Sequence, residues 1–328
     1  MFKINKIKLN RILAGVVILT TSYFSLPTSR LHAAFLDPGY GTRPMGMGGA
    51  FTAVADDINA SLYNPAGVML PDTKLAGFMY AKLYTGLDDV DLGLQHAAFI
   101  LPTEKLGSFG LTWTAFASAS NYSQDTLMVT YAREIPTQGI LPELYGGINI
   151  KYLSLAYGLD ERTRIDPLFV ANGSSKSNYS VDIGFWSSVL ADSDGETSLG
   201  LVYKDVNQPD MGLGTQDLVP AELVIGAKRS IKQLGGIRNA LLAMDVAYRN
   251  QPAVKISDQV DIRVGTEGWF FNKSFAARVG GDLSGLTGGF SIKRRYSNLV
   301  FQLDYALLWP LNIQSTTGSH RMSISCGF

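Results

Sequence analysis

The sequence predicts an all-β protein: a transmembrane antiparallel β-barrel of about fourteen strands with an N-terminal plug, or hatch, segment. Three observations lead to this prediction. Side-chain polarity alternates with a period of two along most of the chain, which is typical of strands with one apolar face. The first residues have the pattern of an export signal. The chain also ends in an alternating segment closed by an aromatic residue, Phe328.

Residues 1–34 are predicted to be a cleaved signal peptide. An apolar run covers residues 12–26, and Ala33 and Ala34 form a small-residue cleavage site. Before the run come four basic residues, Lys3, Lys6, Lys8 and Arg11. The alternative is a membrane anchor, but the apolar run is shorter than the roughly 20 residues that a helix needs to cross a bilayer. We therefore expect export followed by cleavage.

The composition after residue 34 excludes several classes of function. Cleavage leaves 23 basic and 28 acidic residues, a net charge of −5, which gives no electrostatic reason to bind nucleic acid or anionic headgroups. The single cysteine, Cys326, excludes an intramolecular disulfide framework and a multi-cysteine metal site. Hydrophobic residues make up 46% of the chain, with 34 glycines, 15 tyrosines and 16 phenylalanines, although no later segment could form a transmembrane helix. An exported chain of this kind is expected to be a barrel or a β-sandwich.

Residues 35–74 are predicted to be the plug, because they lack strand alternation. A fourteen-strand barrel would be roughly 28 Å across its backbone, and a compact segment of this length could fill its lumen. Gly46, Gly48 and Gly49 would let the backbone pack closely against the wall. Asn64-Pro65 is expected to form a turn, or a kink of the hatch facing the pore or an opening in the wall.

Residues 75–328 are predicted to form the barrel. Ile148, Ile150 and Tyr152, for example, share one face of an extended segment, whereas Asn149 and Lys151 share the other. In a barrel the apolar face would meet lipid, and in a soluble sandwich it would pack on a second sheet. The strands are expected near residues 75–83, 93–101, 106–117, 124–135, 145–157, 178–190, 197–206, 219–230, 237–248, 257–270, 274–282, 286–294, 297–309 and 317–328.

The even number of strands places both termini of the barrel on one side. Short connections are expected on that side and the long loops, 158–177 and 207–218, on the other. The lumen is expected to carry charges of both signs, as a solvated wall of ion pairs or as a selectivity lining. These charges are Lys151, Asp182, Lys204, Glu222, Lys228, Asp245, Arg263, Glu267, Arg278, Asp282, Asp304 and Arg321.

Two segments of the plug resemble the N-terminus of the PorV/PorQ-like proteins, a family of the FadL-like superfamily of outer-membrane barrels. They are residues 41–57, GTRPMGMGGAFTAVADD, and residues 63–67, YNPAG. Residues 219–223, 303–306 and 320–324 and the final Phe328 are similar to that family too. The resemblance implies a fourteen-stranded barrel with an N-terminal hatch in the outer membrane.

The resemblance also implies two different functions. FadL-type members pass small hydrophobic molecules such as fatty acids, which leave by movement of the hatch or by a side opening in the wall. PorV-type members are docking or shuttle components of type IX protein secretion. The expected partners are outer-membrane lipid, a hydrophobic small molecule and the barrel assembly machinery, with a secretion translocon or cargo protein in the second case.

Candidate site residues follow from these expectations. Hatch or gating roles are predicted for Arg43, Gly46, Gly48, Gly49, Asp56, Asp57, Asn64, Pro65 and Ala66. Ligand-lining roles are predicted for Met45, Met47, Phe51 and Val54. The adjacent carboxylates Asp56 and Asp57 would cap a turn or pair with a wall arginine such as Arg263 or Arg278.

The alternating C-terminal residues Met322, Ile324 and Phe328 are predicted to be the assembly signal of the barrel. Only two histidines, His96 and His320, follow the signal peptide, and the G-x-S-x-G nucleophile motif does not occur. We therefore expect no enzymatic activity, no metal and no cofactor. A barrel whose plug never opens is the remaining structural alternative.

Overall fold

The protein is a closed antiparallel barrel of fourteen strands in which β1 pairs with β14. The structure, a computed structural model, describes residue 35 and residues 37–88, 91–119, 121–137, 139, 141–235, 237–251 and 259–328. The strands are β1 (Leu75–Thr85), β2 (Leu92–Thr103), β3 (Gly107–Ser118), β4 (Tyr122–Glu134), β5 (Glu143–Tyr157), β6 (Ser175–Ala191), β7 (Gly195–Lys204), β8 (Glu222–Leu234), β9 (Ile237–Arg249), β10 (Val260–Phe270), β11 (Phe275–Gly281), β12 (Gly285–Tyr296), β13 (Leu299–Pro310) and β14 (Gly318–Gly327). The predicted fold class is confirmed. The predicted signal peptide lies outside the described residues.

The outer and inner faces of the strands differ as the alternation predicts. On β5, Ile148, Ile150 and Tyr152 are exposed on the outside, whereas Asn149 and Lys151 are buried inside. The same outward pattern of large apolar side chains continues on the other strands. Closure pairs every strand on both sides, so the sheet has no free edge. A closed sheet with an apolar outer face meets the two requirements for crossing a bilayer with strands.

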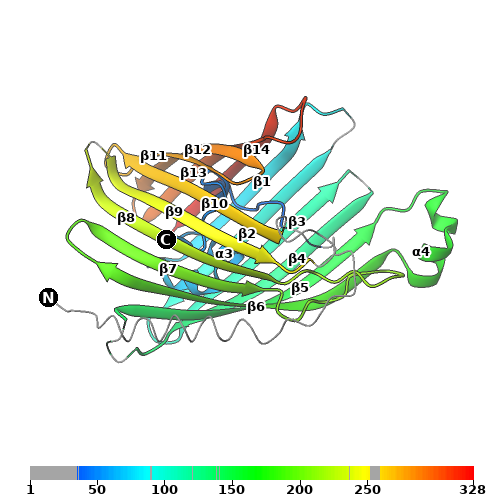
Figure 1. Cartoon of the computed structure of the whole chain (residues 1–328), viewed down its shortest axis with the longest axis horizontal. Coiled ribbons are helices and arrows are strands. Elements are labelled where there is room, and N and C mark those ends of the chain that lie inside the picture. The colour runs from blue at the N-terminus through cyan, green and yellow to red at the C-terminus, as the bar shows by residue number, and fades with distance from the viewer. Residues whose placement is uncertain are drawn as a thin grey trace.

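The two ends of the barrel carry different connections (Figure 1). We call the end at which β1 begins and β14 finishes the terminal end, and the opposite end the loop end. At the terminal end, residues 192–194 and 297–298 suffice to connect neighbouring strands. At the loop end, residues 158–174 contain the 3-10 helix η2 (Thr163–Ile165) and the helix α4 (Pro167–Asn172), and residues 205–221 form a second long loop. Short and long connections thus separate largely as predicted. No helix in the described part of the chain is long and apolar enough to span a membrane.

The second long loop folds back onto the barrel. Its residues Met211 and Val219 are buried against Leu153 and Leu155 of β5, and Phe35 packs against the same cluster. The loop therefore covers part of the loop end instead of extending away from it.

Residues 41–70, which we call the lumenal segment, lie inside the ring of strands (Figure 1, blue). They contain α2 (Thr42–Met45), α3 (Ala60–Tyr63) and the 3-10 helix η1 (Pro65–Met69). Helix η1 contacts β3, β4, β5 and β6, whereas α2 contacts β12, β13 and β14. Most of these residues are buried, and the largest apolar cluster among the described residues forms around Met47, Phe51 and Val54. The segment that lacks the alternating polarity of the strands thus occupies the centre of the barrel, and the strands surround it.

The expected lumenal charges are found on the inner face, with one exception. Asp282 lies in the tight connection between β11 and β12, where its carboxylate accepts hydrogen bonds from the backbone N–H groups of Ser284 and Gly285. The prediction placed Asp282 in the lumen because it extended the strand one residue beyond Gly281, where β11 ends. A short polar side chain that bonds the backbone two residues ahead is typical of a turn.

Candidate functional site

The candidate site is the interface between the lumenal segment and the inner wall, and its strongest contact is a chain of buried charges. Arg43 binds Glu267 of β10 through two parallel hydrogen bonds of 2.8 Å each. Glu267 also accepts a hydrogen bond from Nε of Arg278 on β11, and Arg278 contacts Asp304 of β13. All four side chains are buried. Two-point binding of a guanidinium to a carboxylate fixes both distance and orientation. We call these four residues the anchor.

The adjacent carboxylates Asp56 and Asp57 do not reach a wall arginine. Both bind Nη1 of Arg43, which belongs to the same segment. Arg263, a predicted partner, binds Asp261 and Glu222 instead. The ion-pair alternative therefore had the signs reversed: the segment presents the arginine and the wall presents the carboxylate. The other alternative, a turn cap, is found for Asp57, whose Oδ1 accepts a hydrogen bond of 2.8 Å from the backbone N–H of Asn59.

The charge of Arg43 is maintained by these neighbours. Burial alone would lower the pKa of its guanidinium, but the carboxylates of Asp56, Glu267 and Asp57 raise it well above its ordinary value. For Asp57, burial and the carboxylate of Asp56 raise the pKa, and the opposing attraction of Arg43 only partly offsets them. The carboxylate of Glu267 thus raises the pKa of Arg43 more than the carboxylate of Asp57 does.

Backbone N–H groups of the lumenal segment add further contacts to the wall. The N–H groups of Phe51 and Thr52 both donate to one carboxylate oxygen of Asp245 on β9, at 2.9 Å. The N–H of Gly48 donates to the hydroxyl of Thr287 on β12, also at 2.9 Å. The N–H of Gly48 is shared with the carbonyl oxygen of Met45, whereas Asp245 is the acceptor for Phe51 and Thr52. These bonds hold irregular backbone inside the barrel.

Asn64-Pro65-Ala66 forms a turn with contacts in two directions. The side-chain oxygen of Asn64 accepts a hydrogen bond from the N–H of Ala66, as expected for a local turn. Its amide nitrogen donates to the carbonyl oxygens of Thr52 and of Phe185 on β6, at 3.0 Å each. Asn64 therefore ties two parts of the lumenal segment to the wall, which goes beyond the turn role predicted for it.

Wall glycines allow this close packing. A Cβ atom added to Gly147 of β5 would overlap the backbone of Pro65 and Ala66, and one added to Gly280 of β11 would overlap that of Met47 and Gly48. Three cross-strand pairs of glycines face the lumenal segment in this way: Gly147 with Gly184, Gly200 with Gly226, and Gly265 with Gly280. We call them the glycine pairs. Glycines of the plug were predicted to allow close packing. The contribution of glycines of the wall was not predicted.

The predicted ligand-lining residues are packed rather than open to a cavity. Met47, Phe51 and Val54 are completely buried in the central cluster, and Met45 is nearly so. A cavity of about 90 Å³ inside the barrel lies towards the loop end and is lined by other residues. They include Phe35, Asp37, Pro38, Tyr40 and Leu62 from the residues before and within the lumenal segment, and Thr114, Met128, Lys151 and Leu153 from the wall. Ligand contact by the four predicted residues remains a prediction.

One sector of the inner wall is apolar. The buried inward-facing side chains of β1 are Met79, Ala81 and Leu83, and those of β2 are Leu94, His96, Ala98 and Ile100. Tyr40 packs on this stripe near the loop end, and Ile58 and Leu62 belong to the cluster that includes its other end. The interior of membrane barrels is ordinarily polar. We call this stripe, with the segment residues against it, the apolar seam.

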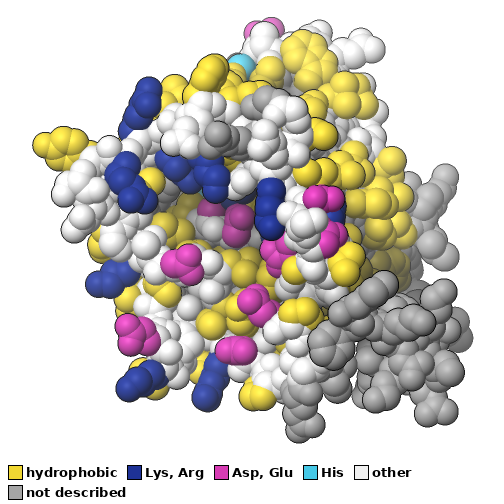
Figure 2. Space-filling model, turned by 90° about the vertical axis from the view of Figure 1, so that its left-hand side faces the viewer, with side chains coloured by type: hydrophobic (Ala, Val, Ile, Leu, Met, Phe, Trp, Pro, Cys, Tyr) yellow, Lys and Arg dark blue, Asp and Glu magenta, His cyan; other side chains and the backbone are white. Residues whose placement is uncertain are grey.

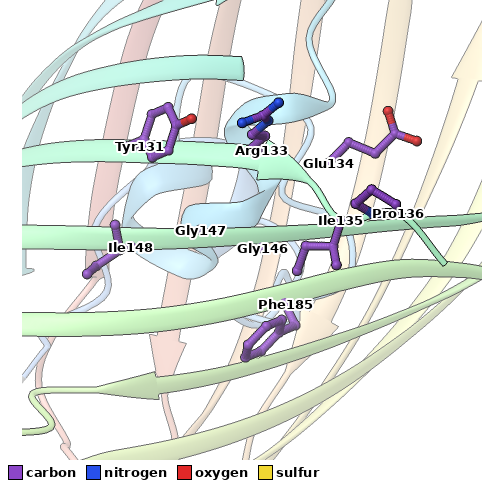
Figure 3. A pocket seen from close by; sticks show the side chains of 9 residues that line it. All are labelled: Tyr131, Arg133, Glu134, Ile135, Pro136, Gly146, Gly147, Ile148 and Phe185. Atoms are coloured by element: carbon purple, nitrogen blue, oxygen red, sulfur yellow. The ribbon is translucent and has the colours of Figure 1, made fainter. Parts of the chain in front are cut away.

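The outer surface has a groove of about 570 Å³ over β4, β5 and β6 (Figure 3). Tyr131, Ile148 and Phe185 border it, and Gly146 and Gly147 form its floor. Behind Gly147 lie Pro65 and Ala66 of the lumenal segment. Neither glycine contributes a side chain to the wall here, and the Ile135 side chain lies over Gly146 on the outer side.

The terminal end differs in character from the flank of the barrel. Figure 2 shows lysine, arginine and acidic side chains gathered over this end and hydrophobic side chains on the flank. Met322, Ile324 and Phe328, predicted as the assembly signal, have exposed side chains on or just after β14. Their recognition by the assembly machinery remains a prediction.

Comparison with known proteins identifies the architecture. No family model matches the chain, and no curated protein matches it in sequence. Among solved structures, a Pseudomonas aeruginosa FadL homologue superimposes with a TM-score of 0.56 at 14% identity, covering 90% of this chain and 99% of that one. The barrel has the FadL-type fold. The Ralstonia pickettii toluene transporter TbuX (TM-score 0.54, 12% identity, 88% and 98% covered) and the CymD monoaromatic hydrocarbon channel (0.54, 14%, 90% and 98%) share it.

Proposed function

We propose that this protein is a passive channel for small hydrophobic molecules in the bacterial outer membrane. Three features support the proposal: the FadL-type fold, the apolar outer face, and the apolar seam inside. The similar barrels TbuX and CymD are described as a toluene transporter and a monoaromatic hydrocarbon channel. The predicted export signal agrees with this location.

The apolar seam is the observation that carries the proposal. Water-filled pores for polar solutes need polar walls, because a polar solute gains nothing from apolar side chains that displace its hydration. A hydrophobic solute gains free energy on leaving water for such a wall, at about 25 cal/mol per Å² of buried apolar surface. From Leu83 and Leu94 near the loop end to Ile100 near the terminal end, β1 and β2 offer this surface along most of their length.

The lumenal segment would act as the gate in this proposal. Its contacts with β9–β13 are directional and charged, whereas its contacts with the seam are apolar and non-directional. A solute can replace apolar contacts one for one, but it cannot replace a two-point ion pair. We therefore propose that solutes pass between the segment and the seam while the anchor stays in place.

Uptake measurements test the proposal. Cells whose outer membrane lacks its own hydrophobic channel are given the wild-type protein, and uptake of radiolabelled dodecane is compared with the empty vector. The proposal expects uptake several times above the vector, and a return to background for Ala81→Phe, which fills the seam. A matched Ala→Phe control away from it is Ala171→Phe, in the exposed loop helix α4. Equal uptake with and without the protein would refute the channel.

The resemblance to PorV and PorQ suggests a docking component of protein secretion instead. The structure offers no specific observation in favour of it, since the long loop 205–221 folds back onto the barrel. Native-membrane purification followed by protein mass spectrometry separates the two functions. A stoichiometric translocon or cargo protein would favour secretion over solute transport.

A further inference from the structure

A single polar side chain interrupts the apolar seam. His96 of β2 lies between Leu94 and Ala98 on the inner face and is 1% exposed. Its Nε2 atom has no hydrogen-bond partner among the residues that the structure describes. Buried polar atoms are almost always paired, so an unpaired one requires an explanation.

Two further unpaired atoms lie close to the same line. Oγ1 of Thr112 on β3 is buried without a partner in the described part of the chain, and so is Oγ of Ser61 in α3. The register of β2 and β3 places Thr112 opposite Ala98, the inward-facing neighbour of His96. Ser61 lies one step nearer the terminal end, because its Oγ is 2.8 Å from the position of a Cβ on Gly110. The three atoms thus lie in a row along the seam, from the loop end towards the terminal end.

The lumenal cavity leads to this row of atoms. Its lining includes Tyr40, Leu62 and Thr114, and Thr114 pairs directly with His96 across the two strands. A solute in the cavity would therefore meet His96 and Thr112 first and Ser61 next. Apart from His96, none of the inward-facing buried residues of β1, β2 and β3 can carry a charge; they are Met79, Ala81, Leu83, Leu94, Ala98, Ile100, Ser108, Gly110, Thr112 and Thr114.

We propose that the seam selects hydrophobic molecules that carry one uncharged hydrogen-bonding head group, such as long-chain alcohols, and that His96, Thr112 and Ser61 bind this hydroxyl in turn. The inference rests on the proposed channel function and names its substrate class. A hydroxyl can both donate and accept, so it can pair with an imidazole nitrogen and with the hydroxyls of threonine and serine. A cationic head group would have to shed its hydration without finding a counter-charge on β1–β3. The buried Arg321 of β14, which pairs with Ala81 across the strands, adds a further positive charge beside the seam.

The test compares uptake of 1-dodecanol with uptake of dodecane in the cells described above. The variants are His96→Leu, Thr112→Val and the two combined, which keep the approximate size of each side chain and remove its hydrogen-bonding atoms. The combined variant should lose about threefold to tenfold in dodecanol uptake, the worth of one or two neutral hydrogen bonds, and keep its dodecane uptake. Thr266→Val is the control, because Thr266 has its hydroxyl on the outer face of β10, bonded to the carbonyl of Leu241.

The heat-modified mobility of the folded barrel on gels shows whether each variant is assembled. Removing unpaired buried atoms should leave the unfolding temperature unchanged or raise it. An unchanged ratio of dodecanol to dodecane uptake in the combined variant would overturn the inference and leave the channel standing; ordered water at the three atoms would give this result. A parallel loss of both solutes in a folded variant would overturn it too. No uptake of either solute by the wild-type protein would refute the channel function itself.

Discussion

The two sides of the lumenal segment are held to the barrel by opposite kinds of interaction. Towards β10–β13 the anchor joins Arg43, Glu267, Arg278 and Asp304. Towards β1 and β2 the apolar seam offers side chains with no ion pair to the segment. Ion pairs inside a protein are costly to separate, whereas apolar contacts are individually weak and can be exchanged for others. The difference indicates which side of the segment is fixed. In the channel proposed above, the side that faces the seam is the one that would admit a solute.

Breaking the anchor should have the largest effect. Glu267→Ala leaves the buried guanidinium of Arg278 with Asp304 as its only carboxylate partner and deprives Arg43 of its wall contact. Removing one member of a buried ion pair costs about 3–5 kcal/mol. We expect a loosened segment, seen as higher and noisier ion conductance in planar bilayers. Glu104→Ala, in an exposed turn, should behave like wild type; quiet, wild-type conductance of Glu267→Ala would show that the anchor does not fix the segment.

Filling a glycine contact should have the next largest effect. Gly147→Ala forces a methyl group into the backbone of Pro65 and Ala66, and overpacking of this kind costs about 1–3 kcal/mol. Gly93→Ala on β2 is the matched control, because the nearest atom there is 3.9 Å away. The unfolding temperature of each variant is measured from the folded and unfolded bands on gels of samples heated to increasing temperatures. If the two variants unfold at the same temperature, close packing at Gly147 does not contribute to stability.

A polar substitution in the seam should lower both transport and stability, because a buried amide needs hydrogen-bond partners that apolar neighbours do not offer. Leu94→Asn keeps the size of a completely buried side chain on β2 but replaces an apolar surface with an amide. The lost transfer free energy of about 1.5–3 kcal/mol corresponds to roughly a tenfold or larger decrease in dodecane uptake. Leu168→Asn in the exposed helix α4 serves as the control. Uptake equal to wild type would mean that solutes do not contact the seam at this position.

The smallest effect is expected for Asp57→Ala. Arg43 keeps both hydrogen bonds to Glu267 and its contact with Asp56, so the wall contact of the segment survives. We expect wild-type permeability to antibiotics and dyes and a loss of about 1 kcal/mol in stability, the typical worth of the hydrogen bond that Asp57 accepts from the N–H of Asn59. If Asp57→Ala were as permeable as Glu267→Ala, the contact between Arg43 and Asp57 within the segment would matter as much as the contact with the wall.

The strands were predictable because each one carries its own signal. A period of two, interrupted by turn residues, located all fourteen, and the inward positions of Asn149 and Lys151 followed from the neighbouring Ile148 and Ile150. The limits appear where contacts join distant parts of the chain. Arg43 and Glu267 are 224 residues apart, and no local pattern relates them. The reversed signs of the predicted ion pair follow from this lack of information.

The glycine pairs show a signal that was present in the sequence but not used. Gly147, Gly184 and Gly226 each interrupt an otherwise alternating strand, and an isolated strand glycine is typical of a close backbone approach. These residues predict that something packs against the wall, although not what it is. The unpaired atoms of His96 and Thr112 gave no such signal, because a polar residue on the inner face of a barrel is ordinary.

The glycine pairs also discriminate against misaligned barrels. A shift of two residues between neighbouring strands keeps every apolar side chain outside, so the alternation of polarity does not oppose it. The same shift would separate Gly147 from Gly184 or Gly265 from Gly280 and bring a side chain against the central backbone. We therefore expect that only a barrel with the correct register between its strands can close around the lumenal segment.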